Sequence, residues 1–161
     1  MISAVDTNVL LDILVPNTPH SEASKALLDQ AYAEGSLIIC EVVYTELLCQ
    51  FETSHDVNVF LSDTGIRLVT SGREALQVAA LAWKDYVSRR TGQLQCARCG
   101  RFQEITCVQC GAAITSRQRI ITDFLIGGHA LTCADRLLSR DRGFYKTYFP
   151  SLKVKAKPGP E

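Results

Sequence analysis

The feature that most constrains the fold of this chain is the alternation of short apolar runs with helix-patterned segments along its whole length. Runs typical of buried strands stand at residues 2–5, 36–40, 66–70 and 136–139, and "LKVK" near the end predicts an edge strand. Between the runs, apolar residues recur at helical spacing. We therefore expect right-handed crossovers and a three-layer α/β/α fold, with a central parallel sheet covered on both faces.

Capping signals and spacing sharpen the helix predictions. "SEASKALLDQAYAEG" predicts a helix with Ser21 as its N-cap and Gly35 as its stop. "SGREALQ" reads as a capping box of Ser71 and Glu74. Several residues are predicted to face the core, namely Ile120, Ile121, Phe124 and Leu125 of a late helix, Trp83 and Tyr86 of the helix before it, and His129.

Acidic residues follow the predicted strands. Asp6 comes directly after the first strand, and Asp141 follows the run at 136–139 with only Arg140 between. Glu46 and Asp123 lie early in helices, so all four carboxylates can reach the carboxyl end of one sheet, where open α/β folds bind ligands. Uncompensated, these carboxylates would repel one another and raise their pKa values.

A hard divalent cation removes that repulsion. Mg²⁺ or Mn²⁺ takes oxygen ligands and binds substrate phosphate as well, which favours attack on a phosphodiester by water that the metal activates. The alternative for any one acidic residue is a helix cap or a solvated charge. We interpret five others in that way: Asp12, Asp29, Glu41, Asp63 and Asp85.

Four of the seven cysteines stand in "QCARCGRFQEITCVQCG", residues 95–111. Two Cys-x-x-Cys-Gly knuckles predict a tetrahedral structural Zn²⁺ site formed by Cys96, Cys99, Cys107 and Cys110. Iron in a site with four sulfur ligands and a redox pair are the alternatives. A site filled by four protein ligands leaves no place for substrate, so we expect the zinc to stabilise and not to catalyse. Cys40, Cys49 and Cys133 are predicted to be small buried hydrophobic residues.

Basic residues accompany both features. We predict RNA phosphate contacts from residues near the cysteines and near Asp141, with solvated charge as the alternative. The residues are Arg98, Arg101, Arg117, Arg119, Arg140, Arg142 and Lys146.

Composition bounds the class of protein. A length of 161 residues with 47% hydrophobic content fits one domain with a core. The formal net charge of zero excludes a global basic field that would attract nucleic acid, so binding to a polyanion needs a local patch. The sequence shows no signal peptide and no apolar run long enough to span a bilayer, which predicts a cytoplasmic protein.

Four segments, "AVDTNVLLD", "VVYTELL", "ITDFLIGGHAL" and "LLSRDRGFYKTYFPSL", resemble in this order the acidic blocks of the PIN-domain nucleases. The last block resembles the VapC-type ribonucleases of bacterial and archaeal toxin–antitoxin pairs. The resemblance covers residues 1–92 and 117–155. It implies a PIN-like nuclease domain over residues 1–155. The cysteine spacing predicts a zinc-ribbon insertion at 94–116 within that domain, and the last residues, 156–161, predict a disordered tail.

The resemblance also implies roles for single residues. Asp6, Glu46, Asp123 and Asp141 would be the ligands of Mg²⁺ or Mn²⁺. Thr7 and Asn8 would orient the first carboxylate. The Ser139 hydroxyl would interact with the metal ligands without binding the metal itself. Two features depart from the family pattern: Gly143 stands where some relatives carry a further Asp, and the cysteine insertion is absent from the relatives considered.

The implied function is a metal-dependent endoribonuclease that cleaves structured RNA, tRNA or ribosomal RNA. In the VapC pattern it would be a toxin, form a homodimer and pair with a small antitoxin protein. One alternative is a housekeeping nuclease that processes RNA. Another is a non-catalytic module in which the zinc ribbon binds RNA or protein.

Overall fold

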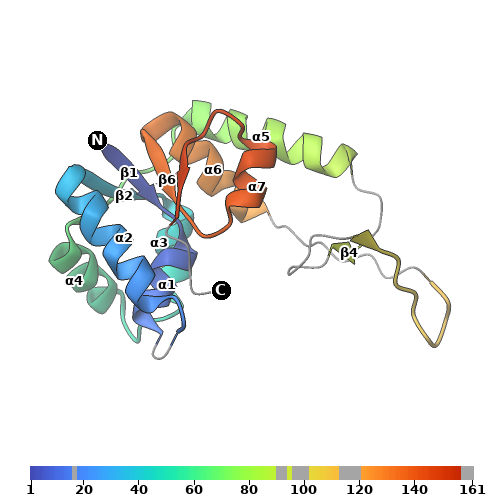
Figure 1. The fold of residues 1–161 in the computed structure, drawn as a ribbon, viewed down its shortest axis with the longest axis horizontal. Coiled ribbons are helices and arrows are strands. Elements are labelled where there is room, and N and C mark those ends of the chain that lie inside the picture. Colours follow the sequence, from blue (N-terminus) through green and yellow to red (C-terminus); the bar gives the residue numbers. More distant parts are fainter. Residues whose placement is uncertain (16–17, 90–93, 96–101, 113–120, 157–161) are drawn as a thin grey trace.

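The computed structural model of the protein describes residues 1–15, 18–89, 94–95, 102–112 and 121–156. Its main sheet has five strands, all parallel, in the order β3-β2-β1-β6-β7 (Figure 1). These strands are β1 (Ile2–Val5), β2 (Ser36–Ile39), β3 (Ile66–Leu68), β6 (Arg136–Leu138) and β7 (Val154–Lys155). The predicted parallel sheet is therefore confirmed, with "LKVK" forming the edge strand β7.

Helices join the strands and cover the sheet. They are α1 (Thr7–Leu14), α2 (Ser21–Glu34), α3 (Glu41–Leu48), α4 (Ser54–Thr64), α5 (Arg73–Ser88), α6 (Ile121–Cys133) and α7 (Arg142–Tyr148). The chain runs outward from β1 to β3 and then returns to β6 and β7 on the other side of β1. Right-handed crossovers consequently place α1 to α4 on one face and α5 to α7 on the other, as Figure 1 shows.

The core lies between these layers, because the central strands are apolar on both sides. Every residue of β6 is buried, and β1 and β2 each bury three of their four residues. Phe124, with no exposed surface, packs its ring against a group of aromatic side chains from α5 and the end of the chain. That group is Trp83, Tyr86, Phe144, Tyr148 and Phe149.

Some local predictions were wrong. Helix α5 has Gly72 as its N-cap and no side-chain cap, because Ser71 hydrogen-bonds to Glu41 instead of closing a capping box with Glu74. A capping box does form at α4, between Thr53 and Asp56. Ser21 is the first residue of α2, and His20 is the N-cap.

Burial also differs from expectation at a few positions. Ile121 is 47% exposed, and Ile120 lies outside the described residues, while Phe124 faces the core as predicted. Cys40 is buried, which raises the pKa of its thiol to about 11, but Cys49 is exposed on the last turn region of α3. Among the described cysteines, Cys40 alone is buried, and it joins the hydrophobic core directly after β2.

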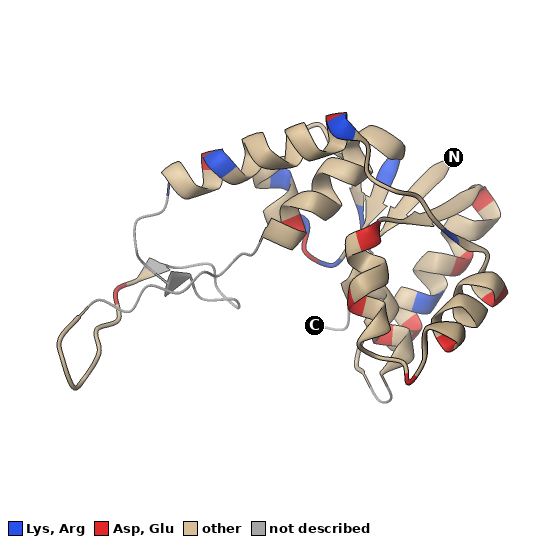
Figure 2. Cartoon of the chain, turned by 180° about the vertical axis from the view of Figure 1, so that it is seen from behind, with Lys and Arg blue, Asp and Glu red and all other residues tan. Residues whose placement is uncertain are grey.

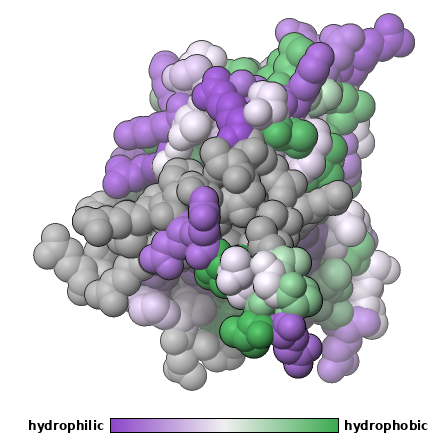
Figure 3. Space-filling view, turned by 90° about the vertical axis from the view of Figure 1, so that its right-hand side faces the viewer, coloured by the Kyte–Doolittle hydropathy of each residue, from purple (hydrophilic) through white to green (hydrophobic). Residues whose placement is uncertain are grey.

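The cysteine stretch leaves the three layers between α5 and α6. Its described part contains a small antiparallel hairpin of β4 (Leu94–Gln95) and β5 (Phe102–Gln103). At this end of the molecule, hydrophobic and hydrophilic side chains are interspersed on the surface (Figure 3), and Val108 is fully exposed. Among the helices within the described ranges, none has the length and apolar character that crossing a membrane requires.

Candidate active site

The order of the strands places a topological switch point at the carboxyl ends of β1 and β6. These two strands are neighbours, yet the connections that leave them run toward opposite edges of the sheet. Asp6 follows β1 directly, and Asp141 follows β6 after Ser139 and Arg140. Parallel α/β sheets bind ligands at such a switch point, because the loops on either side diverge there.

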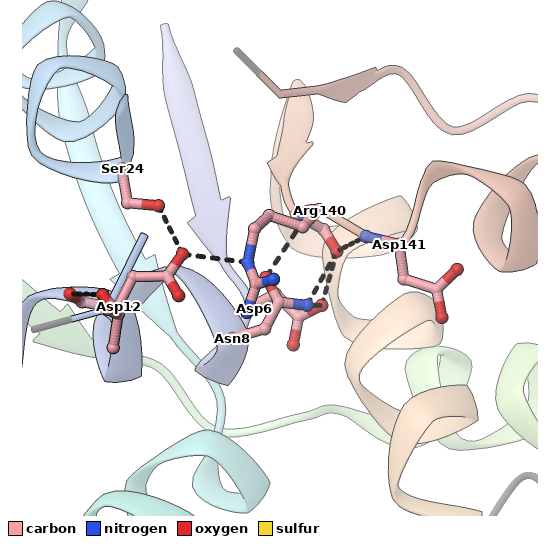
Figure 4. Close-up of polar contacts among 8 residues, drawn as sticks. Asp6, Asn8, Asp12, Ser24, Arg140 and Asp141 are labelled. Atoms are coloured by element: carbon pink, nitrogen blue, oxygen red, sulfur yellow. Dashed lines mark hydrogen bonds and ion pairs between the residues drawn. The ribbon is translucent and has the colours of Figure 1, made fainter. Parts of the chain in front are cut away.

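Hydrogen bonds fix Asp6 at this switch point. Its side chain is 6% exposed, and its Oδ2 atom accepts hydrogen bonds from Asn8 Nδ2 at 2.6 Å and Ser139 Oγ at 2.6 Å (Figure 4). Tyr145 donates its hydroxyl to the same oxygen at 3.2 Å. Burial raises the pKa of Asp6 above its ordinary value, the bonds from Ser139 and Tyr145 oppose that rise, and the charge of Glu46 adds to it.

The other predicted carboxylates gather around the same point. Glu46 on α3 accepts a hydrogen bond from the Thr7 hydroxyl, one residue after Asp6. Burial raises the pKa of the Tyr145 hydroxyl well above its usual range, and the nearby charges of Asp6, Asp123 and Asp141 raise it further. Figure 2 shows acidic and basic segments close together around the loop before α7. The fold thus brings Asp6, Glu46, Asp123 and Asp141 to one edge of the sheet.

Hydrogen bonds hold the loop that carries Asp141. The amide of Asp141 donates to Ser139 Oγ at 3.0 Å, and its Oδ1 caps α7 by accepting from the amide of Phe144 at 3.1 Å. The amide of Arg140 donates to Asn8 Oδ1 at 3.1 Å. Asn8 and Ser139 therefore connect the turn after β1 with the turn after β6.

Asp12 is the residue that sequence reasoning most misjudged, because it is neither a cap nor a solvated charge. It is 3% exposed, and its Oδ2 accepts from Ser24 Oγ at 2.6 Å and pairs with Arg140 Nε at 2.9 Å (Figure 4). No local signal marks Asp12, since its partners come from α2 and from the turn after β6. The pair fixes Arg140 beside Asp6 and Asn8.

A second polar network lies farther along the same edge. Glu41 accepts bonds from the amide and the hydroxyl of Ser71, both at 3.0 Å, and the Ser71 hydroxyl lies 3.3 Å from His129 Nδ1. His129 is 1% exposed, as the expected core histidine, and burial lowers its pKa. This network joins α3, the turn before α5, and α6.

The predicted RNA-binding residues divide into two groups. Arg140, Arg142 and Lys146 stand in or next to the turn that carries Asp141, and all three are exposed. Arg98, Arg101, Arg117 and Arg119 lie outside the described residues. The cysteine site is divided in the same way, because Cys107 and Cys110 are described and Cys96 and Cys99 are not.

In the turn of residues 107–111, backbone amides face the Cys107 sulfur atom. Gly111, at φ +70°, donates its amide to the Cys107 carbonyl at 2.8 Å, and the Cys107 amide donates to the Ala112 carbonyl at 2.8 Å. Hydrogen bonds from the amides of Cys110 and Gln109 lower the pKa of the Cys107 thiol. Backbone amides that face a sulfur atom favour its ionised form, which is the metal-binding form.

The donor set at the sheet edge suits a divalent cation. It consists of carboxylates supported by hydroxyl and amide donors, and burial and mutual charge disfavour the ionised state of Asp6 unless a cation compensates it. Within the described residues, no three His, Cys, Asp or Glu side chains already stand at the mutual distances of a metal-bound cluster.

The fold resembles solved structures of VapC proteins. VapBC2 of Rickettsia felis, bound to a DNA fragment from its promoter, matches with a TM-score of 0.61 and 15% identity over 96% of this chain and 98% of that one. VapBC-1 of nontypeable Haemophilus influenzae matches with a TM-score of 0.60 and 12% identity over 97% and 98%. VapC20 of Mycobacterium tuberculosis, a toxin that cleaves the sarcin–ricin loop, matches with a TM-score of 0.53 and 13% identity over 98% and 99%.

At these identities the likeness shows a shared fold. Comparison of the sequence with curated proteins gives no match. The family model of the PIN domain, in contrast, matches residues 4–150, a range that contains all four clustered carboxylates. The chain therefore belongs to the PIN-domain family.

Proposed function

We propose that this protein is a metal-dependent endoribonuclease of the VapC type that cleaves structured RNA, tRNA or ribosomal RNA. The observation that carries the proposal is the convergence of Asp6, Glu46, Asp123 and Asp141 at the switch point of a parallel sheet. PIN domains generally use divalent metal ions, and this donor set is made of the hard oxygen ligands that such ions prefer.

Mg²⁺ or Mn²⁺ would be held by the four carboxylates. When bound, the ion would lower the pKa of the attacking water and neutralise the charge that develops on the phosphate. Asn8, Ser139 and Tyr145 hold Asp6 through their hydrogen bonds, so the carboxylate keeps its orientation when the ion arrives. Thr7 holds Glu46 in the same manner.

Basic side chains of α7 and of the turn before it would contact the RNA backbone. Arg142 and Lys146 are exposed on α7 next to Asp141, and Arg140 is 41% exposed while its Nε is paired with Asp12. Arg98, Arg101, Arg117 and Arg119 would extend this contact from the cysteine insertion. Because the chain has no net charge, binding would depend on this local group of cations.

The cysteine insertion would hold a structural Zn²⁺ through Cys96, Cys99, Cys107 and Cys110. The amides that face Cys107 support this assignment, since they stabilise the thiolate before any metal binds. Four cysteine ligands close the coordination sphere, so the zinc would stabilise the insertion and the chemistry would stay at the carboxylates.

A toxin of this type would act with protein partners. Two of the solved structures with this fold are VapBC complexes, and the DNA fragment in one of them comes from the promoter of that pair. We propose a small antitoxin protein as the partner of this chain and a homodimer as its assembly. A cytoplasmic location follows from an RNA substrate of this kind.

Cleavage of a mixture of total tRNA and ribosomal RNA tests the proposal. The protein is loaded with zinc, dialysed free of Mg²⁺ and Mn²⁺, and assayed with and without either ion, which avoids a chelator that would strip the zinc. Wild type should give discrete fragments only with the ion, and Asp123→Asn should give none. Asp63→Asn, an exposed carboxylate on α4, is the matched control and should cleave normally. Cleavage by Asp123→Asn at the wild-type rate would refute the assignment.

A further inference from the structure

Tyr145 contacts the site although the acidic motifs do not include it. The side chain lies on α7 and is 1% exposed, and its hydroxyl donates to Asp6 Oδ2 at 3.2 Å across 139 residues of sequence. Its ring packs against Phe144, with centroids 4.9 Å apart, and against Phe149, with centroids 6.2 Å apart. Packing therefore fixes the ring, and the fixed ring places the hydroxyl.

The hydroxyl completes a set of donors on one carboxylate oxygen. Asp6 Oδ2 also accepts from Asn8 Nδ2 and Ser139 Oγ, each at 2.6 Å, and three donors fill the capacity of a single carboxylate oxygen. An ion that approached Oδ2 would have to displace one of them. Oδ1 is thus the oxygen that Asp6 can offer to a cation.

We propose that Tyr145 is a positioning residue that makes Asp6 a one-oxygen ligand of the divalent ion by holding Oδ2 away from the metal. The proposal rests on the function proposed above. Mg²⁺ requires near-ideal octahedral geometry at short distances, which a carboxylate binding through one oxygen satisfies more easily than one binding through both. Residues that orient a ligand in this manner commonly contribute about 10-fold to 100-fold to metal affinity.

The test is the affinity of the RNA-free, zinc-loaded protein for Mn²⁺, measured by electron paramagnetic resonance of the free ion. Tyr145→Phe removes the hydroxyl and keeps the ring, and should weaken Mn²⁺ binding by about 10-fold. Tyr44→Phe is the matched control, because it also deletes a hydroxyl that donates to a side chain, Asn58 Oδ1 at 3.1 Å. That control should bind Mn²⁺ as wild type does.

Ser139→Ala provides a second probe, since it deletes another donor to the same oxygen. It should weaken Mn²⁺ binding in the same direction, and it decides the question if Tyr145→Phe does not fold. Unchanged or tighter Mn²⁺ binding by the folded Tyr145→Phe variant overturns the proposal, as does unchanged binding by Ser139→Ala where only that variant folds.

Failure of this inference is distinct from failure of the proposed function. A wild-type protein that neither binds Mn²⁺ nor cleaves RNA contradicts the proposed function, and the role of Tyr145 falls with it. A wild-type protein that binds Mn²⁺ and cleaves RNA, next to a Tyr145→Phe variant with equal affinity, contradicts the role of Tyr145 alone. Thermal melting of each variant confirms that the compared proteins are folded.

Discussion

Replacing Asp12 by Asn tests the buried ion pair beside the candidate active site. The Asp12 side chain is 4% exposed, and its Oδ2 accepts from both Ser24 and Arg140. Asn keeps an oxygen that can accept both bonds, so the variant loses only the charge. A hydrogen bond to a charged group contributes about 1 kcal/mol more than a neutral one. Two such bonds give about 2 kcal/mol, with the share of Arg140 reduced because that side chain is 41% exposed.

For a chain of this length, a loss of about 1–2 kcal/mol lowers the melting temperature by roughly 2–8 °C. Asp12→Ala should lower the free energy of unfolding by about 1–3 kcal/mol more than Asp12→Asn does, because the buried Ser24 hydroxyl then loses its hydrogen-bond acceptor at position 12. Differential scanning calorimetry measures both variants, with Asp29→Asn, an exposed carboxylate on α2, as the control. RNA cleavage should also slow, since Arg140 is tied to Asn8 in the turn that carries Asp141. If Asp12→Asn had the same melting temperature as Asp29→Asn, the ion pair of Asp12 and Arg140 would contribute nothing to stability and the reasoning would be wrong.

Three further variants test the core, the first carboxylate and the cysteine site. Phe124→Ala leaves a cavity at the centre of the aromatic group and should lower the free energy of unfolding by about 3–5 kcal/mol, measured by urea denaturation. Tyr32→Ala on the surface should lower it little. Because burial raises the folded-state pKa of Asp6, its protonated form adds stability at low pH that is lost as pH rises through the raised pKa. Without divalent ions, Asp6→Asn should therefore gain melting temperature over wild type as the pH rises above about 4, the ordinary pKa of an Asp side chain, and a constant difference would contradict this. Cys107→Ser should lose zinc in atomic emission measurements and melt earlier, while Cys49→Ser should keep its zinc.

The strands and the acidic residues were predictable because their signals are local. An apolar run such as "SLII" can be buried on both faces only inside a parallel sheet, and Asp6 follows its run directly. The order of the strands was not encoded in any single segment, yet the right-handed rule and the alternation of elements restrict it strongly. The family resemblance then strengthened the prediction for Glu46 and Asp123, whose helical positions alone are ordinary.

The errors at Ser71 and Asp12 share one physical cause, namely a distant partner that outcompetes a local pattern. Ser71 has the spacing of a capping box, but Glu41 lies close enough to take both its amide and its hydroxyl. Asp12 has the appearance of a surface charge in a helix until Arg140 is placed next to it. The hydroxyl of Tyr145 reaches Asp6 only after β6 pairs with β1. Contacts of this kind exist only in the folded chain, so sequence spacing cannot reveal them.

The position of the cysteine insertion follows from the packing of α5 against α6. A Cβ on Gly128 would clash with the Ala75 carbonyl oxygen, so the two helix backbones touch where α5 begins and in the second half of α6. At the opposite end of the pair, the rings of Tyr86 and Phe124 lie 5.5 Å apart. The helices are therefore antiparallel, and the chain between them must leave and return beside Phe124. Asp123 precedes that residue, so an insertion at this connection starts next to a candidate catalytic carboxylate while the sheet remains undisturbed.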